Sequence, residues 1–233
     1  MNFAQIGLLV PTLLLPRAGV DLTRWAVVAC DQFTSEPDYW ARVQRLVGES
    51  ASTLKLILPE AFLGTEDEAR RIRDIQSAMR RYLAEGVLAQ QPPGLVLVER
   101  ETARGRKRKG LIAALDLEHY DFTPGAKTLI RPTEGTILER LPPRIRVREG
   151  APLELPHVMV LIDDPERRVI EPLFAESLEK LYDFPLMLDS GRVRGWRVDR
   201  PESIRRVAAG LARLADPAAF GDRHGADGEP VLL

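Results

Sequence analysis

The sequence has one cysteine and almost no net charge. Cys30 is the only cysteine among 233 residues, so an internal disulfide is excluded and a reducing compartment is favoured. Thirty-three Lys and Arg residues nearly balance 34 Asp and Glu residues, which gives a formal net charge of −1. Nucleic-acid-binding proteins usually carry a basic excess, so nucleic acid is disfavoured as a partner.

The sequence also lacks a long uninterrupted apolar run. Its start, MNFAQIGLLVPTLLLPRAGV, is apolar, but Pro11 and Pro16 interrupt it. No Lys or Arg precedes Arg17, whereas a signal peptide begins with a basic region. The run is also shorter than the roughly 20 residues that a membrane helix needs. We therefore expect extended segments of a soluble, cytoplasmic protein with no membrane partner.

Three segments have the spacing of amphipathic helices, namely residues 35–48, 65–86 and 201–214. The middle segment has the clearest boundaries, because Thr65 and Glu68 predict a capping box and Gly86 predicts a C-terminal cap. Its many Arg and Glu residues are expected to form a solvated face with i,i+4 pairs. The apolar stripes of the second and third helices consist of Ile72, Ile75, Met79 and Leu83, and of Ile204, Val207, Ala208, Leu211 and Leu214.

Apolar, β-branched runs predict strands at residues 25–30, 54–58, 94–99, 110–115 and 157–162. The third and fourth runs flank ETARGRKRK, which indicates a hairpin with a basic tip. A solvated tip is favoured over a phosphate or nucleic-acid contact, because no aromatic residue lies within it. Strands and helices mix without a strict βαβ order. The expected fold class is α+β, a mixed sheet with flanking helices, with a soft boundary near residue 120.

Five phrases of the sequence resemble a known family, the domain-of-unknown-function family 1015 of bacteria and archaea. They occur in the family's order over essentially the whole chain: WAVVACDQFTSEPDYW, STLKLILPE, RKGLIAALDLEHYDF, TLIRPTEGTILERLPPR and LELPHVMVLIDDP. Members of the family are longer, and carry an Asp-Gly-(Asn/His)-His motif beyond the point where this chain stops. That motif is similar to one in the ParB/sulfiredoxin-like fold, which includes free serine kinases.

The resemblance implies that residues 1–233 form a single region equivalent to the N-terminal half of the family. Residues 225–229, GADGE, lack the histidine of the motif. We expect the C-terminal half to be absent, and the final apolar residues to be the start of an unfinished strand.

The segment from Thr128 to His157 carries the main candidate site. The family phrase of Arg, Glu, Thr and Arg matches Arg131, Glu134, Thr136 and Arg140. Arginine offers forked donors to phosphate oxygens, so these residues, together with Glu139, are predicted to bind a phosphorylated small metabolite. Glu134 would orient an arginine or act as a base. The alternative is an ion-paired strand edge.

Three further positions are weaker candidates. His157 is either an acid–base group or metal ligand, or a structural histidine, which is the more common case. Asp163 and Asp164 would hold Mg²⁺ at a strand end, or form an ordinary Asp-Asp-Pro turn, which we favour. Asp31, as a catalytic group, and Gln32, as a ligand-binding group, follow the first predicted strand.

Three functions remain open. The first is phosphoryl transfer to or from a serine-type metabolite, with Mg²⁺ and a nucleotide as cofactors, by analogy with the similar fold. The second is non-catalytic sensing of a ligand in the same pocket. The third is a nucleic-acid-associated, ParB-like role, which the neutral net charge disfavours. The sequence does not fix a substrate or an oligomeric state.

Overall fold

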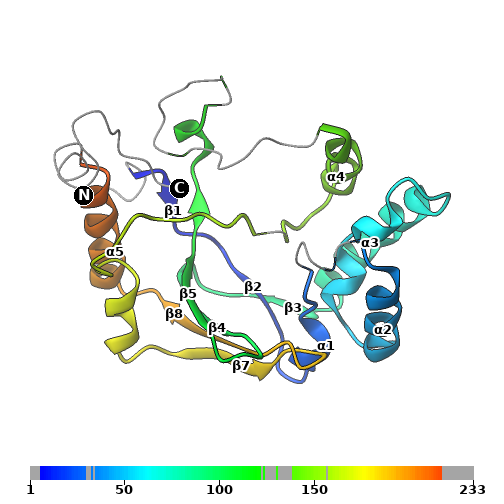
Figure 1. Cartoon of the computed structure of the whole chain (residues 1–233), viewed down its shortest axis with the longest axis horizontal. Helices are drawn as coiled ribbons and strands as arrows, with labels where there is room; N and C mark the ends of the chain where they lie inside the picture. The colour runs from blue at the N-terminus through cyan, green and yellow to red at the C-terminus, as the bar shows by residue number, and fades with distance from the viewer. Residues whose placement is uncertain are drawn as a thin grey trace.

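The computed structural model confirms the α+β class. It describes residues 6–29, 33, 35–121, 123, 130, 138–155 and 157–216, with only the backbone of Arg140. Strands occupy the middle of the molecule, with helix α5 at one end and helices α2 and α3 at the other (Figure 1). The longest helix in this part of the chain is α3, and no helix in it has the length and apolar character needed to cross a membrane.

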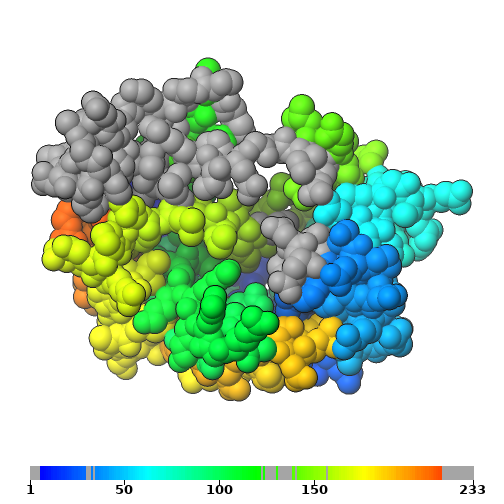
Figure 2. Space-filling model, viewed as in Figure 1, coloured from blue at the N-terminus to red at the C-terminus, as the bar shows by residue number. Residues whose placement is uncertain are grey.

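A four-stranded sheet forms the central layer, in the order β5-β4-β8-β7. Each neighbouring pair is antiparallel. Strands β4 and β5 make the predicted hairpin, whose tip is exposed on the face seen in Figure 2. The sheet strands are β4 (Leu95–Glu101), β5 (Lys107–Ile112), β7 (Lys180–Pro185) and β8 (Arg192–Val198).

Two short antiparallel pairs and one parallel bridge complete the described β-structure. The first pair joins β1 (Leu8–Leu9) to β6 (Ala114–Leu115), and the second joins β2 (Leu14–Pro16) to β3 (Leu88–Gln90). The parallel bridge joins Tyr120 to Ile130. The N-terminal apolar run is therefore extended, as predicted, with Pro16 at the end of a strand that pairs on one side.

Helix α5 (Pro201–Leu214) covers one face of the sheet. Val207 and Leu211 of α5 share a hydrophobic core with Leu95, Leu97 and Val198 of the sheet. All five are at most 3% exposed, and burial of such a side chain stabilises the fold by roughly 1.5–3 kcal/mol. The predicted inner face of α5 is confirmed. Leu173 of the short 3-10 helix η6 (Glu171–Ala175) joins the same core.

Helices α2 (Pro37–Val47) and α3 (Glu68–Ala84) confirm two further predicted helices. Ile75 and Met79 of the α3 stripe pack in one core, and Trp40 of α2, which is fully buried, packs in another. Gly86 has φ 64° and follows the end of α3, as expected for the left-handed residue that closes a helix.

The predicted capping box at the start of α3 is wrong in detail. Thr65 Oγ1 donates to the carbonyl of Phe62, and does not cap the helix. Glu68 does reach back, but its carboxylate accepts from the N–H of Gly64 at 2.7 Å. Both side chains therefore bind backbone groups of the turn that precedes the helix.

The predicted strand at residues 25–30 is also wrong. Helix α1 (Leu22–Trp25) occupies its start, since Asp21 Oδ1 accepts from the N–H groups of Thr23 and Arg24. Residues 26–29 have no regular structure, and Cys30 lies outside the described residues. Thr53 Oγ1 donates to the Trp25 carbonyl at 2.8 Å. Side chains therefore satisfy backbone groups that a neighbouring strand would otherwise bind.

The predicted strand at residues 54–58 is instead the 3-10 helix η2 (Thr53–Leu56). Ser52 caps it, because its Oγ accepts from the N–H of Leu54. A second 3-10 helix, η3 (Glu60–Phe62), follows Pro59. The apolar side chains of this run still serve the interior, because Leu56 is 1% exposed.

Residues 157–162, predicted as a strand, form no ladder, and Val158 and Met159 are 77% and 74% exposed. From Thr128 to His157, where a strand edge was the alternative to a site, the described residues contain no strand, and Ile130 forms only the isolated bridge to Tyr120. The 3-10 helix η4 (Leu117–His119) precedes this segment, the 3-10 helix η5 (Leu138–Arg140) lies within it, and α4 (Leu141–Arg148) follows η5. Gln76 on α3 donates to the carbonyls of Arg146 and Glu149, which attaches α4 to α3.

Candidate functional site

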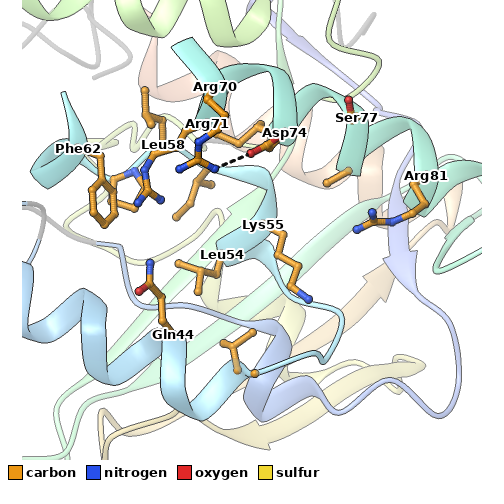
Figure 3. Close-up of a pocket in the computed structure, with 16 residues that line it drawn as sticks. Gln44, Leu54, Lys55, Leu58, Phe62, Arg70, Arg71, Asp74, Ser77 and Arg81 are labelled. Carbon is orange, nitrogen blue, oxygen red and sulfur yellow. Dashed lines mark hydrogen bonds and ion pairs between the residues drawn. The ribbon is translucent and has the colours of Figure 1, made fainter. Parts of the chain in front are cut away.

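A pocket of about 450 Å³ lies between α2, the η2–η3 segment and α3. This volume is within the range of small-molecule sites, which runs from about 300 to 1,000 Å³. Figure 3 shows Arg71 and Phe62 at one end of the pocket, and Arg81 and Lys55 at the other. Between these ends the lining is largely apolar and comprises Val47, Leu54, Ile57, Leu58, Ile75 and Ala78.

Helix α3 provides the cationic wall of this pocket. Arg71, Ile75, Ala78 and Arg81 recur at helical spacing, so they line one face of the helix. Ten residues separate the two arginines, which places their backbones about 15 Å apart along the axis at the helical rise of about 1.5 Å per residue. The pocket is therefore an elongated groove with a positive charge at each end.

Arg71 is the most unusual side chain in the groove. Its guanidinium carbon lies 3.7 Å from the centre of the Phe62 ring, a short cation–π distance. Its Nε is buried and has no hydrogen-bond partner. No ion pair to Arg71 is found within the described part of the chain. The ring fixes the plane of the guanidinium, so its remaining donors are held in place without being used.

The other charges of the groove differ in how far they are neutralised. Arg70 is held between Asp67 at 2.9 Å and Asp74 at 3.2 Å, and hydrogen bonding to Asp67 raises the pKa of Arg70. Lys55 Nζ donates to the carbonyl of Glu49 at 3.1 Å. Arg81 lies over the edge of the groove, 5.8 Å from the Tyr82 ring centre. No carboxylate of the described residues pairs with Arg81.

The groove therefore has four cations and a single carboxylate, Asp74, which is committed to Arg70. Such an excess favours an anionic ligand, and forked arginine donors suit phosphate or carboxylate oxygens. Gln44 and Ser77 add neutral hydrogen-bonding groups to the walls. The apolar middle would accept the uncharged part of such a ligand.

Half of the ten site residues predicted from the sequence lie outside the described residues. These are Asp31, Gln32, Arg131, Glu134 and Thr136. Arg140 ends helix η5, and its side chain is likewise not described. Their convergence on one phosphate site stays a prediction. Of the remaining arginines in that segment, Arg146 is paired with Glu68, and Arg148 lies 2.9 Å from Glu154.

Four other candidates can be placed. Glu139 is exposed on η5, and His157 is exposed in a segment without regular structure. Asp163 is partly buried in the loop before η6. Asp164 Oδ2 accepts from the N–H of Val169 at 2.8 Å, which is the turn alternative. No group of three His, Cys, Asp or Glu side chains that would hold a metal ion occurs in the described ranges.

Sequence reasoning missed Arg71, because the charged residues of α3 were all interpreted as a solvated face. A signal was present: Arg71 stands four residues before the buried Ile75 and seven before the buried Ala78, so it continues a buried stripe. A charge in such a position is exceptional. No local sequence pattern indicated that Phe62, the last residue of η3, would be the partner of Arg71.

Comparison with known proteins gives one match. The family described as "Protein of unknown function (DUF1015)" matches residues 14–224, which confirms the resemblance carried by the sequence phrases. No curated protein and no solved structure matches the chain. The similarity to the ParB/sulfiredoxin-like fold stays a prediction.

Proposed function

The chain belongs to a family of unknown function, DUF1015, and we propose that it binds a phosphorylated small metabolite. The binding site would be the groove between α2 and α3. One observation carries this proposal. Arg71 is fixed on the Phe62 ring, and its buried Nε has no partner. The ring holds the guanidinium in one orientation, so an anion that binds its terminal nitrogens does not have to order the side chain first.

The ligand would place an anionic group at one end of the groove and extend toward the other. Arg71 would take one oxygen pair through its free edge, because its face is already against Phe62. Arg81 and Lys55 would hold a second anionic group or a terminal carboxylate. A phosphorylated amino acid such as phosphoserine has both kinds of group. This agrees with the serine-type ligand that the resemblance implies.

Phosphoryl transfer is a separate step beyond this proposal. It would require the groups predicted at Glu134 and Arg131, together with Mg²⁺ and a nucleotide. Binding to the α2–α3 groove is the part of the hypothesis that the geometry of the described residues supports. A turnover assay therefore tests the phosphoryl-transfer prediction, whereas a binding assay tests the groove.

The test is calorimetric titration with phosphoserine and, separately, with ATP. Replacing Arg71 with Met should weaken binding of the preferred compound about tenfold to a hundredfold, because a charge-assisted hydrogen bond contributes roughly 1.5–3 kcal/mol. Arg71→Lys should recover little, because an ammonium cannot reproduce the fork. Arg73→Met is the matched control, since Arg73 is exposed on the same helix and does not line the groove.

The proposal fails if the wild-type protein binds neither compound. It also fails if Arg73→Met and Arg71→Met lose the same affinity, which would indicate general attraction to a basic helix. Following ³¹P signals of a mixture of ATP and serine in the same experiment would report any transfer of phosphate.

A further inference from the structure

A second hollow lies between α5 and the loop that leads into η6. Figure 1 shows α5 at the opposite end of the molecule from α2 and α3. Its volume is about 390 Å³. Its charged lining consists of arginine alone: Arg167 and Arg168 from the loop, and Arg206 and Arg213 from α5. Ala209, Gly210 and Pro172 form the rest. Four permanent positive charges around one hollow attract an anion.

The spacing along α5 explains how the hollow forms. Arg206, Gly210 and Arg213 follow one another at steps of four and three residues, so they lie on one helix face. A Cβ atom on Gly210 would lie 3.1 Å from Val169 Cγ2, so glycine lets the loop approach the helix closely. The small residues Ala209 and Gly210 form the base of the hollow, and Arg206 and Arg213 lie on either side of them.

Two of the arginines are held in place by neighbouring carboxylates. Glu176 accepts from Arg206 and also from the hydroxyl of Ser203 at 2.6 Å, which fixes one end of the hollow. Arg168 pairs with Glu166 at 2.6 Å. Arg167 and Arg213 have no ion pair or hydrogen bond from their guanidinium groups to any residue that the structure describes. The hollow therefore offers two oriented and two unpaired cations.

The loop presents Arg167 through a strained backbone. Arg167 has φ 56°, in the left-handed region that residues other than glycine rarely adopt. The Arg167 N–H donates to the Asp164 carbonyl at 3.0 Å, and the Asp164 carboxylate accepts from the Val169 N–H at 2.8 Å. Asp164 thus closes the loop on both sides of Arg167. Backbone strain that the surroundings enforce is concentrated at ligand-binding positions.

From this arrangement we propose a second anion site, specific for a diphosphate or triphosphate group, with the unpaired Arg167 and Arg213 and the oriented Arg206 as its ligands and Asp164 as its positioning residue. The arginines of α5 are separated by about 10 Å along the axis, at the helical rise of about 1.5 Å per residue. A chain of phosphates can reach both, whereas a single phosphate reaches one. No aromatic side chain lines the hollow, so it offers no stacking surface for the bases of a nucleic acid.

This site is independent of the α2–α3 groove, so each proposal can fail alone. The experiment is titration of the full chain with inorganic triphosphate at fixed ionic strength. It is carried out in an Arg71→Met background, which removes the principal arginine of the groove. Arg167→Gln and Arg213→Gln should each weaken binding about tenfold. Arg205→Gln is the matched control, because Arg205 is an exposed neighbour on α5 that does not line the hollow, and it should change affinity less than twofold.

Asp164→Ala separates a positioned site from general electrostatics. Removal of a negative charge beside the hollow should strengthen the binding of any anion if only net charge matters. If Asp164 positions Arg167, the same substitution should weaken binding severalfold. Asp164→Asn should retain most of the affinity, because its amide oxygen can still accept from Val169 N–H. Thermal melting checks that both variants remain folded.

Weakened binding in Asp164→Ala, with little change in Arg205→Gln, supports the site. The proposal is overturned if wild-type protein does not bind triphosphate, if Arg205→Gln weakens binding as much as Arg213→Gln, or if Asp164→Ala binds more tightly. If Asp164→Ala does not fold, Arg167→Gln and the asparagine variant still decide the outcome.

Discussion

The central sheet and the α2–α3 groove are both rich in arginine, and Arg194 of the sheet differs from Arg71 of the groove in its partners. Across the sheet, Lys109, Glu99, Arg194 and Asp183 stand side by side on β5, β4, β8 and β7. Arg194 Nη1 lies 2.7 Å from Glu99 and 3.1 Å from Glu101, and hydrogen bonding to Glu101 raises the pKa of Arg194. In the groove, by contrast, Arg71 and Arg81 pair with no described carboxylate.

The difference teaches that the pairing of arginines, and not their density, separates structural positions from candidate binding positions. The segment from Thr128 to His157 is the main site candidate in the sequence because it contains many charged residues. Two of its described arginines, Arg146 and Arg148, are paired with Glu68 and Glu154. Arg71 occurs in a stretch that looks ordinary by density, yet its partner is an aromatic ring. Exposed ion pairs stabilise a fold little, at about 0–1 kcal/mol each, so paired arginines are easily tolerated.

The largest expected effect on stability is at Arg197, the most buried arginine of the sheet. It is 7% exposed, and its guanidinium donates to Glu179 at 2.9 Å, to Gln91 at 2.8 Å and to the Pro92 carbonyl. Arg197→Met should lower the free energy of unfolding by roughly 2–4 kcal/mol, since hydrogen bonds to a charged group and packing are lost together. Urea denaturation measures it, with Lys107→Met as the exposed control. If Arg197→Met lowered the free energy of unfolding no more than Lys107→Met does, the polar contacts of Arg197 would not contribute to stability.

A smaller, pH-dependent effect is expected at Tyr182. Its ring covers Gly195, where a Cβ would lie 2.1 Å from Tyr182 Cζ, and burial raises the pKa of Tyr182 to about 12. A folded-state pKa above the unfolded value contributes stability that is complete below pH 10 and is lost as the pH rises toward 12.

Tyr182→Phe removes this titration. The free energies of unfolding of wild type and variant should run parallel up to pH 9, and differ by about 1 kcal/mol more at pH 11, with the variant favoured. Denaturation curves at pH 8, 9, 10 and 11 would check this. Parallel curves over the whole range would show that the tyrosine ionises as easily in the fold as in the unfolded chain.

The elements that could be predicted from the sequence are those whose reasons are local. The stripes of α3 and α5 and the β4–β5 hairpin follow from spacing along a single segment. The run from Trp25 to Val28 was predicted wrongly because its backbone is bound by Thr53 and by the Tyr39 hydroxyl, which lie far away in the sequence. The groove has the same character: α3 supplies the arginines, but Phe62 makes one of them unusual, and only the fold brings the two together.

The central claim is that unpaired Arg71 serves a ligand while paired Arg194 serves the fold. The most direct measurement is a parallel comparison of Arg71→Met and Arg194→Met by urea denaturation and by calorimetric titration with phosphoserine. Arg71→Met should lose at least tenfold in affinity and only about 1 kcal/mol in stability, the contribution of a partly exposed cation–π contact. Arg194→Met should lose stability and keep its affinity. Equal losses in both assays for the two variants, or the reverse assignment, would contradict the account.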